Sequence, residues 1–480
     1  GSPGRNLQSL TVGATYNNMT SSLIATLEID EKEYTVIPMV GSSKTNEPIT
    51  GKIIFGGYGK MDDLKNIDVK NSIVIVERGS NVKDELLFFS IKEMNVANAG
   101  AKALIVFNNQ PGIFLGELIH EFSEPGYIPQ IPVVSIDREE GLEIIELIKN
   151  DSEGIIHLFF NPDFIAHFSS RGPVSPFYIK PDMVAPGAYI NSTQTNGMYN
   201  FTSGTSFAAP HVSGAAALLL QKNPELQNYE IKSLLTTTVK PVSDAYGKEF
   251  SLHESGSGRL DIASAYNAKL IINPTNFVIN LSVDQPSIEK QLELKLIEEK
   301  LGKIDVKFEG PKFVEFKHNI KNNNLQIGLN MIEEKFGEHE GKIFINHEKI
   351  KYTIPVLIHY TEGSVSLKQE NEKLFLEIKH PDEWSFAKIT VTNSKNGNVE
   401  TITTTPDKEV FLEIYENAEY WIDAKIKVNG NTSDAFNTIK ITSLSEKIQK
   451  IELTNIPERQ IILIISIMVV IGIIGLAIRK

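Results

Sequence analysis

The most informative segment of this 480-residue sequence reads Phe201-Thr202-Ser203-Gly204-Thr205-Ser206-Phe207-Ala208-Ala209-Pro210-His211-Val212-Ser213-Gly214. Gly204 lets the backbone approach a bound molecule closely, and Ser206 stands where a loop enters a helix predicted over about 207–222. An oxygen at that position meets free backbone N–H groups and the positive end of the helix dipole. The segment is therefore compatible with a serine nucleophile whose developing charge is stabilised there, or with a serine that only caps the helix.

The predicted helix is rich in small apolar residues, with alanine at 208, 209 and 215–217 and Gly214 among them. Because this leaves almost no polar face, we expect the helix to be buried in the middle of a domain. A second helix near Tyr229 carries Ile231, Leu234 and Leu235 at core spacing. Five residues on a helix turn His211 about 140° away from Ser206, so we interpret His211 as a structural helix residue and not as a catalytic base.

The pattern Gly-Thr-Ser-x-Ala-x-Pro followed by His-Val-x-Gly resembles the nucleophile signature of the subtilisin-like serine proteases, the subtilases of peptidase family S8. The resemblance implies that Ser206 is the nucleophile and that its own N–H contributes to the oxyanion hole. Residues 166–173, 180–187 and 255–260 match other stretches of the family in order and spacing, and we expect them to be scaffold. The opening residues 1–15 resemble the strand that follows the oxyanion-hole asparagine.

The other members of such a triad are missing from the sequence. The family order is Asp, His, Ser, but no Asp-Thr/Ser-Gly strand end and no His-Gly-Thr-His helix start occurs here. His120, His157 and His167 precede Ser206, and none of them is followed by Gly-Thr. Because the chain starts at Gly1 and not at Met, we expect it to be the carboxy-terminal portion of an enzyme, inactive alone, with the Asp, the His and the oxyanion Asn upstream.

Two alternatives remain open at this point. Gly204-x-Ser206-x-Ala208 also approximates the nucleophile elbow of α/β-hydrolases, whose acid and histidine follow the serine, which makes Asp244 and His253 candidates. The other alternative is a catalytically inactive surface binding or adhesion scaffold built on a degenerate protease core. The intact Ser206 argues against that scaffold, because a decayed site has no chemical need for a serine there.

The expected fold class is α/β, with the carboxy-terminal half of a subtilisin-like parallel-sheet domain formed by residues 1–21 and 162–268. Residues 22–161 alternate strands and helices where large family members carry a protease-associated insert, and the resemblance implies such a domain here. Within it we predict buried strands at 72–77 and 103–107 with a helix between them. Asp137 and Glu140 have capping-box-like spacing ahead of a further helix with Leu142, Ile145 and Ile148 on one face.

Period-two alternation takes over after about residue 271. We predict one β-sandwich over 269–361, similar to fibronectin III domains, and a second over 362–450. Asn429-Gly430 is a strong hairpin signal within the second. Residues 461–478 contain only Ser466 as a polar residue, which predicts a single transmembrane helix over 460–478, with the protease and the β-modules on the extracellular side of the cell membrane.

Composition narrows the possible partners. The formal net charge of −13 argues against nucleic acid, and the absence of cysteine excludes disulfides, thiolate metal sites and a cysteine nucleophile. No carboxylate cluster has a calcium-loop pattern, so we expect no cofactor and no metal site. The expected partners are protein or peptide substrates and the membrane.

Overall fold

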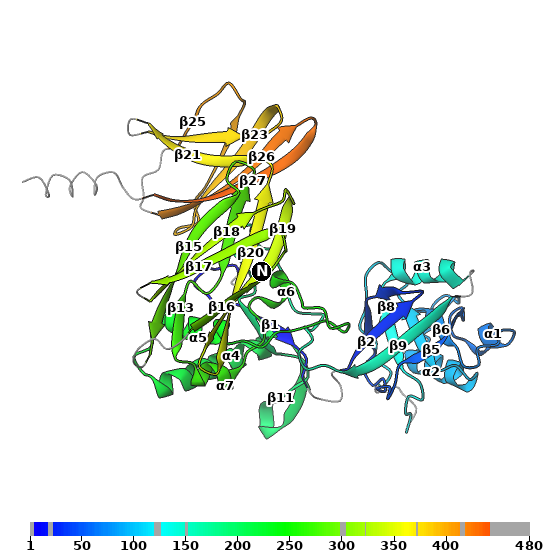
Figure 1. The fold of residues 1–480 in the computed structure, drawn as a ribbon. Coiled ribbons are helices and arrows are strands. Elements are labelled where there is room, and N and C mark those ends of the chain that lie inside the picture. Colours follow the sequence, from blue (N-terminus) through cyan, green and yellow to red (C-terminus); the bar gives the residue numbers. More distant parts are fainter. Residues whose placement is uncertain are drawn as a thin grey trace, which may run out of the picture.

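The computed structural model describes residues 4–17, 23–119, 126–148, 152–297, 304–321, 323–370, 373–412 and 418–441. It contains a core unit (residues 4–17 and 161–268), an insert lobe (23–160), a first β-module (270–361) and a second β-module (364–441). The insert lobe stands apart from the core unit, and the β-modules stack above that unit in Figure 1. The predicted membrane helix at 460–478 lies outside the described residues. Within them, no helix combines the length and the apolarity needed to cross a membrane.

The core unit is organised by two parallel strands. Thr11 precedes the first of these strands and Asp182 the second, and the Asp182 carboxylate accepts a hydrogen bond from the Thr11 N–H at 2.8 Å. The same buried carboxylate pairs with Lys180 at 2.6 Å and with Lys232 at 2.7 Å, which joins both strand starts to a helix. The elements are β1 (Val12–Thr15), β10 (Met183–Pro186), β11 (Ile190–Thr193), a 3-10 turn (Thr195–Gly197), β12 (Tyr199–Thr202), α4 (Thr205–Lys222), α5 (Asn228–Thr237), α6 (Leu252–Ser255) and α7 (Ile262–Asn267).

The insert lobe leaves and rejoins the core unit at adjacent points. Tyr16 donates its N–H to the Phe164 carbonyl at 2.8 Å, and Ala166 donates to Ala14 at 2.8 Å. One side chain of the core unit also reaches the lobe: the Tyr246 hydroxyl donates to the Leu27 carbonyl at 2.9 Å and accepts from the Leu27 N–H at 3.0 Å. Over the described residues, the lobe is therefore attached by a paired stem, by this tyrosine and by the packing of Ile24 and Phe159 in the hydrophobic core of the core unit.

An eight-stranded sheet of order β3-β2-β9-β5-β6-β7-β8-β4 forms the lobe, and β5 to β8 within it are parallel. Successive residues of the buried central strands face opposite sides, so Val74 and Val76 meet the core on the side of α2 while Ile73 and Ile75 meet the core on the side of α3. The elements are β2 (Leu23–Ile29), β3 (Lys32–Tyr34), β4 (Val36–Pro38), β5 (Ile49–Phe55), α1 (Met61–Leu64), β6 (Ile73–Glu77), α2 (Phe89–Asn98), β7 (Ala103–Phe107), β8 (Val133–Ile136), α3 (Arg138–Leu147) and β9 (Glu153–Phe160).

The predicted strands at 72–77 and 103–107, and the helix between them, are confirmed by β6, β7 and α2. Asp137 does cap α3, accepting from the Glu139 N–H at 2.7 Å. The predicted inner face of α3 is wrong in part, because Leu142 is exposed while Gly141 and Ile144 are buried. Gly141 packs so closely on Phe107 that a β-carbon would lie 2.2 Å from the Phe107 β-carbon, and this close packing rotates the helix.

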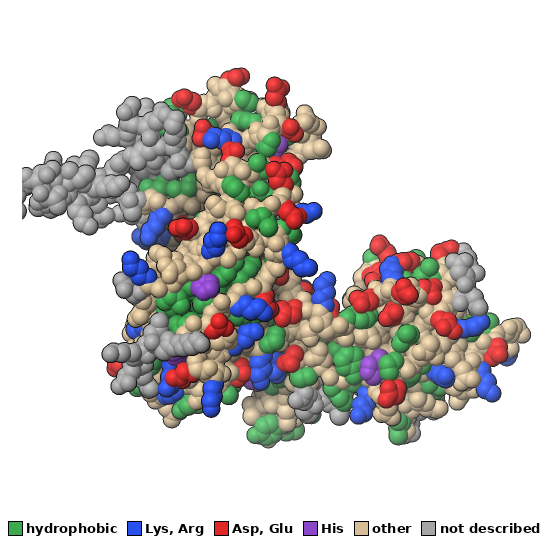
Figure 2. Space-filling model, in the orientation of Figure 1, with side chains coloured by type: hydrophobic (Ala, Val, Ile, Leu, Met, Phe, Trp, Pro, Cys, Tyr) green, Lys and Arg blue, Asp and Glu red, His purple; other side chains and the backbone are tan. Residues whose placement is uncertain are grey.

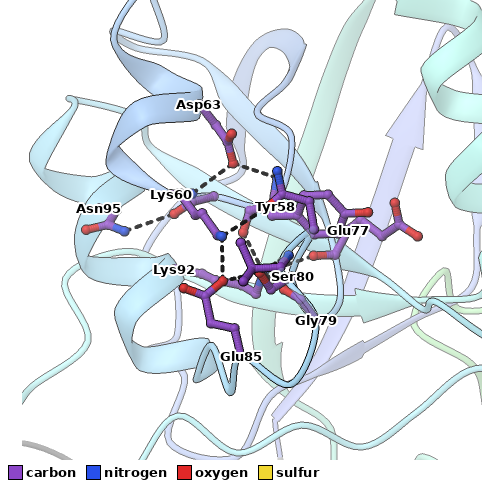
Figure 3. A network of polar contacts seen from close by, with 12 residues as sticks. Tyr58, Lys60, Asp63, Glu77, Gly79, Ser80, Glu85, Lys92 and Asn95 are labelled. Atoms are coloured by element: carbon purple, nitrogen blue, oxygen red, sulfur yellow. Dashed lines mark hydrogen bonds and ion pairs between the residues drawn. The ribbon is translucent and has the colours of Figure 1, made fainter.

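A buried lysine links the loops at the carboxyl ends of β5 and β6 (Figure 3). Lys92 of α2 is fully buried, and its ammonium donates to the backbone carbonyls of Tyr58 at 2.5 Å, Glu77 at 3.0 Å and Gly79 at 2.8 Å. Burial lowers the pKa of Lys92 to about 8. One cation therefore satisfies three carbonyls from two separate loops.

The β-modules follow the core unit as predicted from the alternation. The first consists of the sheets β13-β15-β18-β17 and β14-β20-β19-β16, and the second of β21-β22-β25 and β24-β23-β26-β27. Asn429 (φ 50°) and Gly430 (φ 83°) connect β26 to β27 by a two-residue turn, which confirms the hairpin. The bounds are β13 (Leu270–Asn273), β14 (Phe277–Ser282), β15 (Ser287–Leu296), β16 (Ile304–Glu309), β17 (Val314–Lys321), β18 (Asn324–Met331), β19 (Gly337–His347), β20 (Ile350–Thr361), β21 (Ser364–Glu370), β22 (Lys373–Lys379), β23 (Trp384–Asn393), β24 (Val399–Thr404), β25 (Val410–Leu412), β26 (Ala418–Val428) and β27 (Asn431–Ile441).

Candidate active site

The turn that presents Ser206 is held by a second loop of the core unit. Gly204 donates its N–H to the Gly187 carbonyl at 2.8 Å, and the Ser203 hydroxyl accepts from the Tyr189 N–H at 2.9 Å. Gly187 has to be a glycine, because a β-carbon there would lie 2.7 Å from the Ala14 β-carbon and 2.9 Å from the Gly204 carbonyl oxygen. The turn is thus packed directly against β1 and the end of β10.

Ser206 is the second residue of α4 and its side chain is exposed. The N-cap of α4 is Gly204 and no side chain caps the helix, so helix capping does not explain the serine. Among the contacts of the described residues, neither the Ser206 hydroxyl nor its N–H has a hydrogen bond. The first turn of a helix offers N–H groups and positive potential, so this hydroxyl lies where an oxyanion could be stabilised.

Histidine residues near Ser206 in the sequence are engaged elsewhere. His211 Nδ1 donates to the Phe207 carbonyl of its own helix at 2.8 Å, which fits the structural role expected for it. His167 hydrogen-bonds to the Tyr16 hydroxyl at 3.2 Å, and burial, followed by the charge of Arg171, lowers the pKa of His167. His157 bonds to Thr45 in the insert lobe, and His120 lies outside the described residues.

The α/β-hydrolase alternative finds no support in these contacts. The Asp244 carboxylate accepts the N–H groups of Tyr246 and Lys248, both at 2.9 Å, within a tight turn. His253 Nε2 lies 2.9 Å from the Glu338 carboxylate of the first β-module. Each candidate partner thus has a local structural role, and neither of them contacts Ser206 among the described contacts.

The expectation that α4 is buried on all sides is wrong. Only the face formed by Ala208, Val212, Ala215 and Leu219 is buried. Leu218 is 42% exposed and Leu220 39% exposed, and a β-carbon at Gly214 would meet no atom within 4 Å. The physical reason is that the sheet beneath the helix has two strands only, β1 and β10, so no further described element covers the outer face.

An apolar groove of about 720 Å³ runs beside this exposed face, between α4, α5 and the residues before β1. Its apolar lining includes Leu10, Val12, Val212, Leu220, Ile231 and Leu235. Val12 belongs to β1, whose second edge pairs with no strand over the described residues. On that edge Ala14 already accepts the Ala166 N–H and donates to the Ser169 hydroxyl. The uncovered apolar face of α4 beside a parallel sheet is unusual, because parallel sheets are normally covered on both faces.

The hairpin that leads into the Ser206 turn also exposes apolar side chains. Met198 is 57% exposed, Tyr199 69% and Phe201 49%, and a hydrophobic patch is visible at the bottom of the molecule in Figure 2, where this hairpin projects. Asn17, which follows β1, donates its amide to the Ala188 carbonyl at 2.6 Å, beside the loop that holds the Ser206 turn. Sequence reasoning missed Asn17, because a single polar residue after a strand carries no periodic signal.

Comparisons with known proteins show the family of this chain. The subtilase family model matches residues 1–283, more than half of the chain. The minor extracellular protease Vpr of Bacillus subtilis is 25% identical over 388 residues, covering 75% of this chain and 46% of that protein. The subtilisin-like protease SBT1.6 of Arabidopsis thaliana is 31% identical over 239 residues, covering 43% of this chain and 30% of that protein. The C5a peptidase of Streptococcus pyogenes is 28% identical over 291 residues, covering 57% of this chain and 23% of that protein. The chain spans less than half the length of these relatives. It belongs to the subtilase family of serine proteases.

Proposed function

We propose that the protein is an extracellular subtilisin-type serine endopeptidase in which Ser206 forms the acyl-enzyme with protein or peptide substrates. The observation that carries this proposal is the placement of Ser206, exposed and without a hydrogen bond among the described contacts, on the first turn of α4 in the turn held by Gly187 and Tyr189. Its hydroxyl would attack the peptide carbonyl, and its N–H would stabilise the oxyanion.

The partners of Ser206 are proposed to come from a polypeptide segment that covers the outer face of α4 and the start of β1 at Val12. That segment would supply the Asp, the His that takes the hydroxyl proton, and the oxyanion Asn. The apolar groove of about 720 Å³ supports this proposal, because it offers a surface of the kind that packs against further strands and helices of a sheet domain. Loss of the serine or the histidine of such a triad costs about 10⁶ in turnover, roughly 8 kcal/mol, so residues 1–480 alone should be inactive.

The other parts of the chain complete the proposal. We assign the catalytic domain to 1–21 and 162–268, a protease-associated insert to 22–161, β-sandwiches to 269–361 and 362–450, and a single membrane anchor to 460–478. A role of the insert in substrate access is supported by Glu117 of the lobe, whose charge acts on a residue beside the Ser206 turn. Burial, followed by the negative charge of Glu117 of the lobe, raises the pKa of Tyr189, which lies beside the Ser206 turn. The extracellular location is supported by the extracellular relative from Bacillus subtilis.

The test uses the full-length parent protein and a fluorophosphonate probe that labels active serine hydrolases. We expect labelling of the wild type and none of Ser206→Ala. Ser213→Ala is the matched control, since Ser213 is an exposed serine on the same helix whose hydroxyl donates to the Ala209 carbonyl; this variant should label as the wild type does. A folded wild type without labelling would refute the protease and favour the inactive adhesion scaffold.

A further inference from the structure

The hairpin of β11 and β12 has one outward face and one inward face. The two strands are antiparallel, with Asn191 opposite Phe201 and Thr193 opposite Tyr199. Because paired residues point to the same side of a sheet, these four side chains share one face, and all four are exposed. The other face is turned toward the protein. Its half-buried residues are Ile190, Ser192 and Thr202.

The hairpin is fixed at both ends. At its base, Tyr189 donates its N–H to the Ser203 hydroxyl at 2.9 Å. At its tip, Gln194 donates its N–H to the Met198 carbonyl at 2.7 Å. The strand β11 projects away from the core unit at the bottom of Figure 1. The outward face is therefore a fixed surface that stands out from the protein.

Two aromatic rings lie on this outward face. Tyr199 is 69% exposed and Phe201 is 49% exposed, and neither ring stacks on another ring of the described residues. Single exposed apolar side chains are common, but adjacent ones that form a patch usually mark a surface that another group covers. The two rings therefore favour a covering group on this side of the hairpin.

The same face supplies an attachment point. Asn191-Ser192-Thr193 has the acceptor pattern for N-linked glycosylation. Asn191 and Thr193 are two residues apart in a strand, so both point outward, and the Asn191 amide has no hydrogen bond among the contacts of the described residues. Opposite residues of an antiparallel pair have β-carbons about 4.5–5.5 Å apart. A sugar on Asn191 would thus begin beside the ring of Phe201.

The other acceptor patterns within the described residues lack this combination. Asn200 belongs to the inward face of the hairpin. The side-chain oxygen of Asn280 is buried in the first β-module. Asn431 lies opposite Val428, a buried side chain without a ring. Over the described part of the chain, only Asn191 joins an outward amide to exposed aromatic rings.

We propose that Asn191 carries an N-linked glycan whose first sugar packs on Phe201 and Tyr199. The donor would be an oligosaccharide linked to a polyprenyl phosphate or diphosphate. The Asn191 Nδ2 atom attacks the anomeric carbon, so that an N–C bond forms, the C–O bond to the phosphate breaks, the lipid phosphate leaves as an anion and the amide proton passes to a base. The apolar C–H face of the sugar ring then covers the aromatic rings, while its hydroxyl groups face water.

This inference rests on the extracellular location in the proposed function and does not depend on Ser206 as a nucleophile. The first experiment maps glycopeptides of the full-length parent protein, purified from the medium or the surface of the cells that produce it. Chymotrypsin cleaves after Tyr189 and Tyr199, so the peptide 190–199 separates Asn191 from Asn200. We expect a sugar mass on Asn191 in the fragment spectrum of this peptide. A peptide 190–199 found only without sugar would overturn the proposal.

Fluorophosphonate labelling of the same sample keeps the two proposals apart. An unmodified Asn191 in a protein that the probe labels would overturn the glycan and leave the protease standing. A glycan on Asn191 in a protein that the probe does not label would support the glycan and count against the protease.

Variants locate the attachment. Asn191→Gln and Thr193→Val should both lose the sugar, because each destroys the acceptor pattern while keeping a side chain of similar size. Thr193→Ser restores the hydroxyl and should retain the sugar. Asn200→Gln is the matched control from the same hairpin and should leave the glycan on the 190–199 segment unchanged. A sugar on this segment that survives Thr193→Val would contradict an N-linked glycan at Asn191.

A melting-temperature cycle tests the packing of the sugar on the rings. We expect Asn191→Gln to lower the melting temperature of the glycosylated parent by about 1–3 °C, the scale of one aromatic contact. In a Phe201→Ala background the same change should have little effect, because the ring beneath the sugar is gone. An equal loss in both backgrounds, or no loss in either, would overturn the assigned packing.

Discussion

Replacement of Lys92 by methionine separates the cost of burying its ammonium from the gain of its hydrogen bonds. Methionine keeps the apolar stem but leaves the carbonyls of Tyr58, Glu77 and Gly79 without this donor. Three bonds to a charged donor are worth about 4–6 kcal/mol together, allowing for non-additivity. The lowering of the lysine pKa from 10.5 to about 8 corresponds to about 3 kcal/mol of opposing cost. We therefore expect Lys92→Met to destabilise the insert lobe by about 2 kcal/mol near pH 7.5.

The pH dependence gives the sharper test. Because the pKa of Lys92 is lower in the folded state than in the unfolded state, the unfolded chain binds more protons between about pH 8 and 10.5, and stability rises with pH in that window. From pH 7.5 to 9.5 the wild type should gain about 2 kcal/mol relative to Lys92→Met. Other titrating groups cancel in this difference between the two proteins.

Differential scanning calorimetry of the whole chain measures both effects. The transition of the insert lobe is the one that the substitution shifts, by about 5 °C for a lobe of this size. The control is Lys83→Met, since Lys83 is an exposed lysine of the same lobe. The difference in free energy of unfolding between wild type and Lys92→Met should grow from pH 7.5 to 9.5. If this difference stays constant, or if the substitution does not shift the lobe transition, the burial cost and the hydrogen-bond gain assigned to Lys92 are wrong.

Three other substitutions test contacts between parts of the chain. Ser233→Ala should lower the free energy of unfolding in urea by about 2–3 kcal/mol, because the buried hydroxyl donates to the Ile272 carbonyl at 2.9 Å and accepts from the Ile272 N–H at 2.8 Å. The control Thr236→Ala loses only a hydrogen bond within its own helix and should lower it by less than about 1 kcal/mol. Tyr246→Phe should loosen the insert lobe, seen as a broader distance distribution in small-angle scattering, and an unchanged profile would contradict the latch role of the hydroxyl. Glu340→Gln should weaken docking of the first β-module by about 1–2 kcal/mol, because its carboxylate accepts the Leu252 N–H with both oxygens; limited proteolysis between the two units measures this, and equal cleavage rates would contradict it.

Local signals in the sequence predicted the fold well where the structure depends on neighbours in the chain. The Asn429-Gly430 turn requires positive φ at both residues, and Asp137 needs only its own helix to act as a cap, so both predictions were confirmed. The resemblance around Ser206 likewise predicted the turn that the structure contains, although its catalytic role stays a proposal.

Predictions failed where distant parts of the chain decide the outcome. The composition of α4 indicated burial on all sides. A helix face is buried only where another element packs against it, and among the described residues the sheet of β1 and β10 covers only one face of α4. Leu142 was assigned to the inner face of α3 by its spacing with Ile145 and Ile148, but the close contact of Gly141 with Phe107 sets the rotation of the helix. The junction of the core unit with both β-modules, which holds Asp423 and His359, could not be predicted, since its walls come from residues 173–176, 336–362 and 423–436, which lie far apart in the sequence.

The paired stem of the insert lobe has a consequence for the order of folding. Thr15 and Ile165 are bridged across the whole lobe, so in an unfolded chain their pairing closes a very long loop. Once the lobe has folded, its two ends already lie together and the same pairing is nearly local. The lobe should therefore fold before β1 pairs with its neighbouring strand. Because the two ends of the lobe lie together, a short connecting peptide could replace the whole lobe. In this way a large domain can be gained or lost within a loop while its host keeps almost the same contact order.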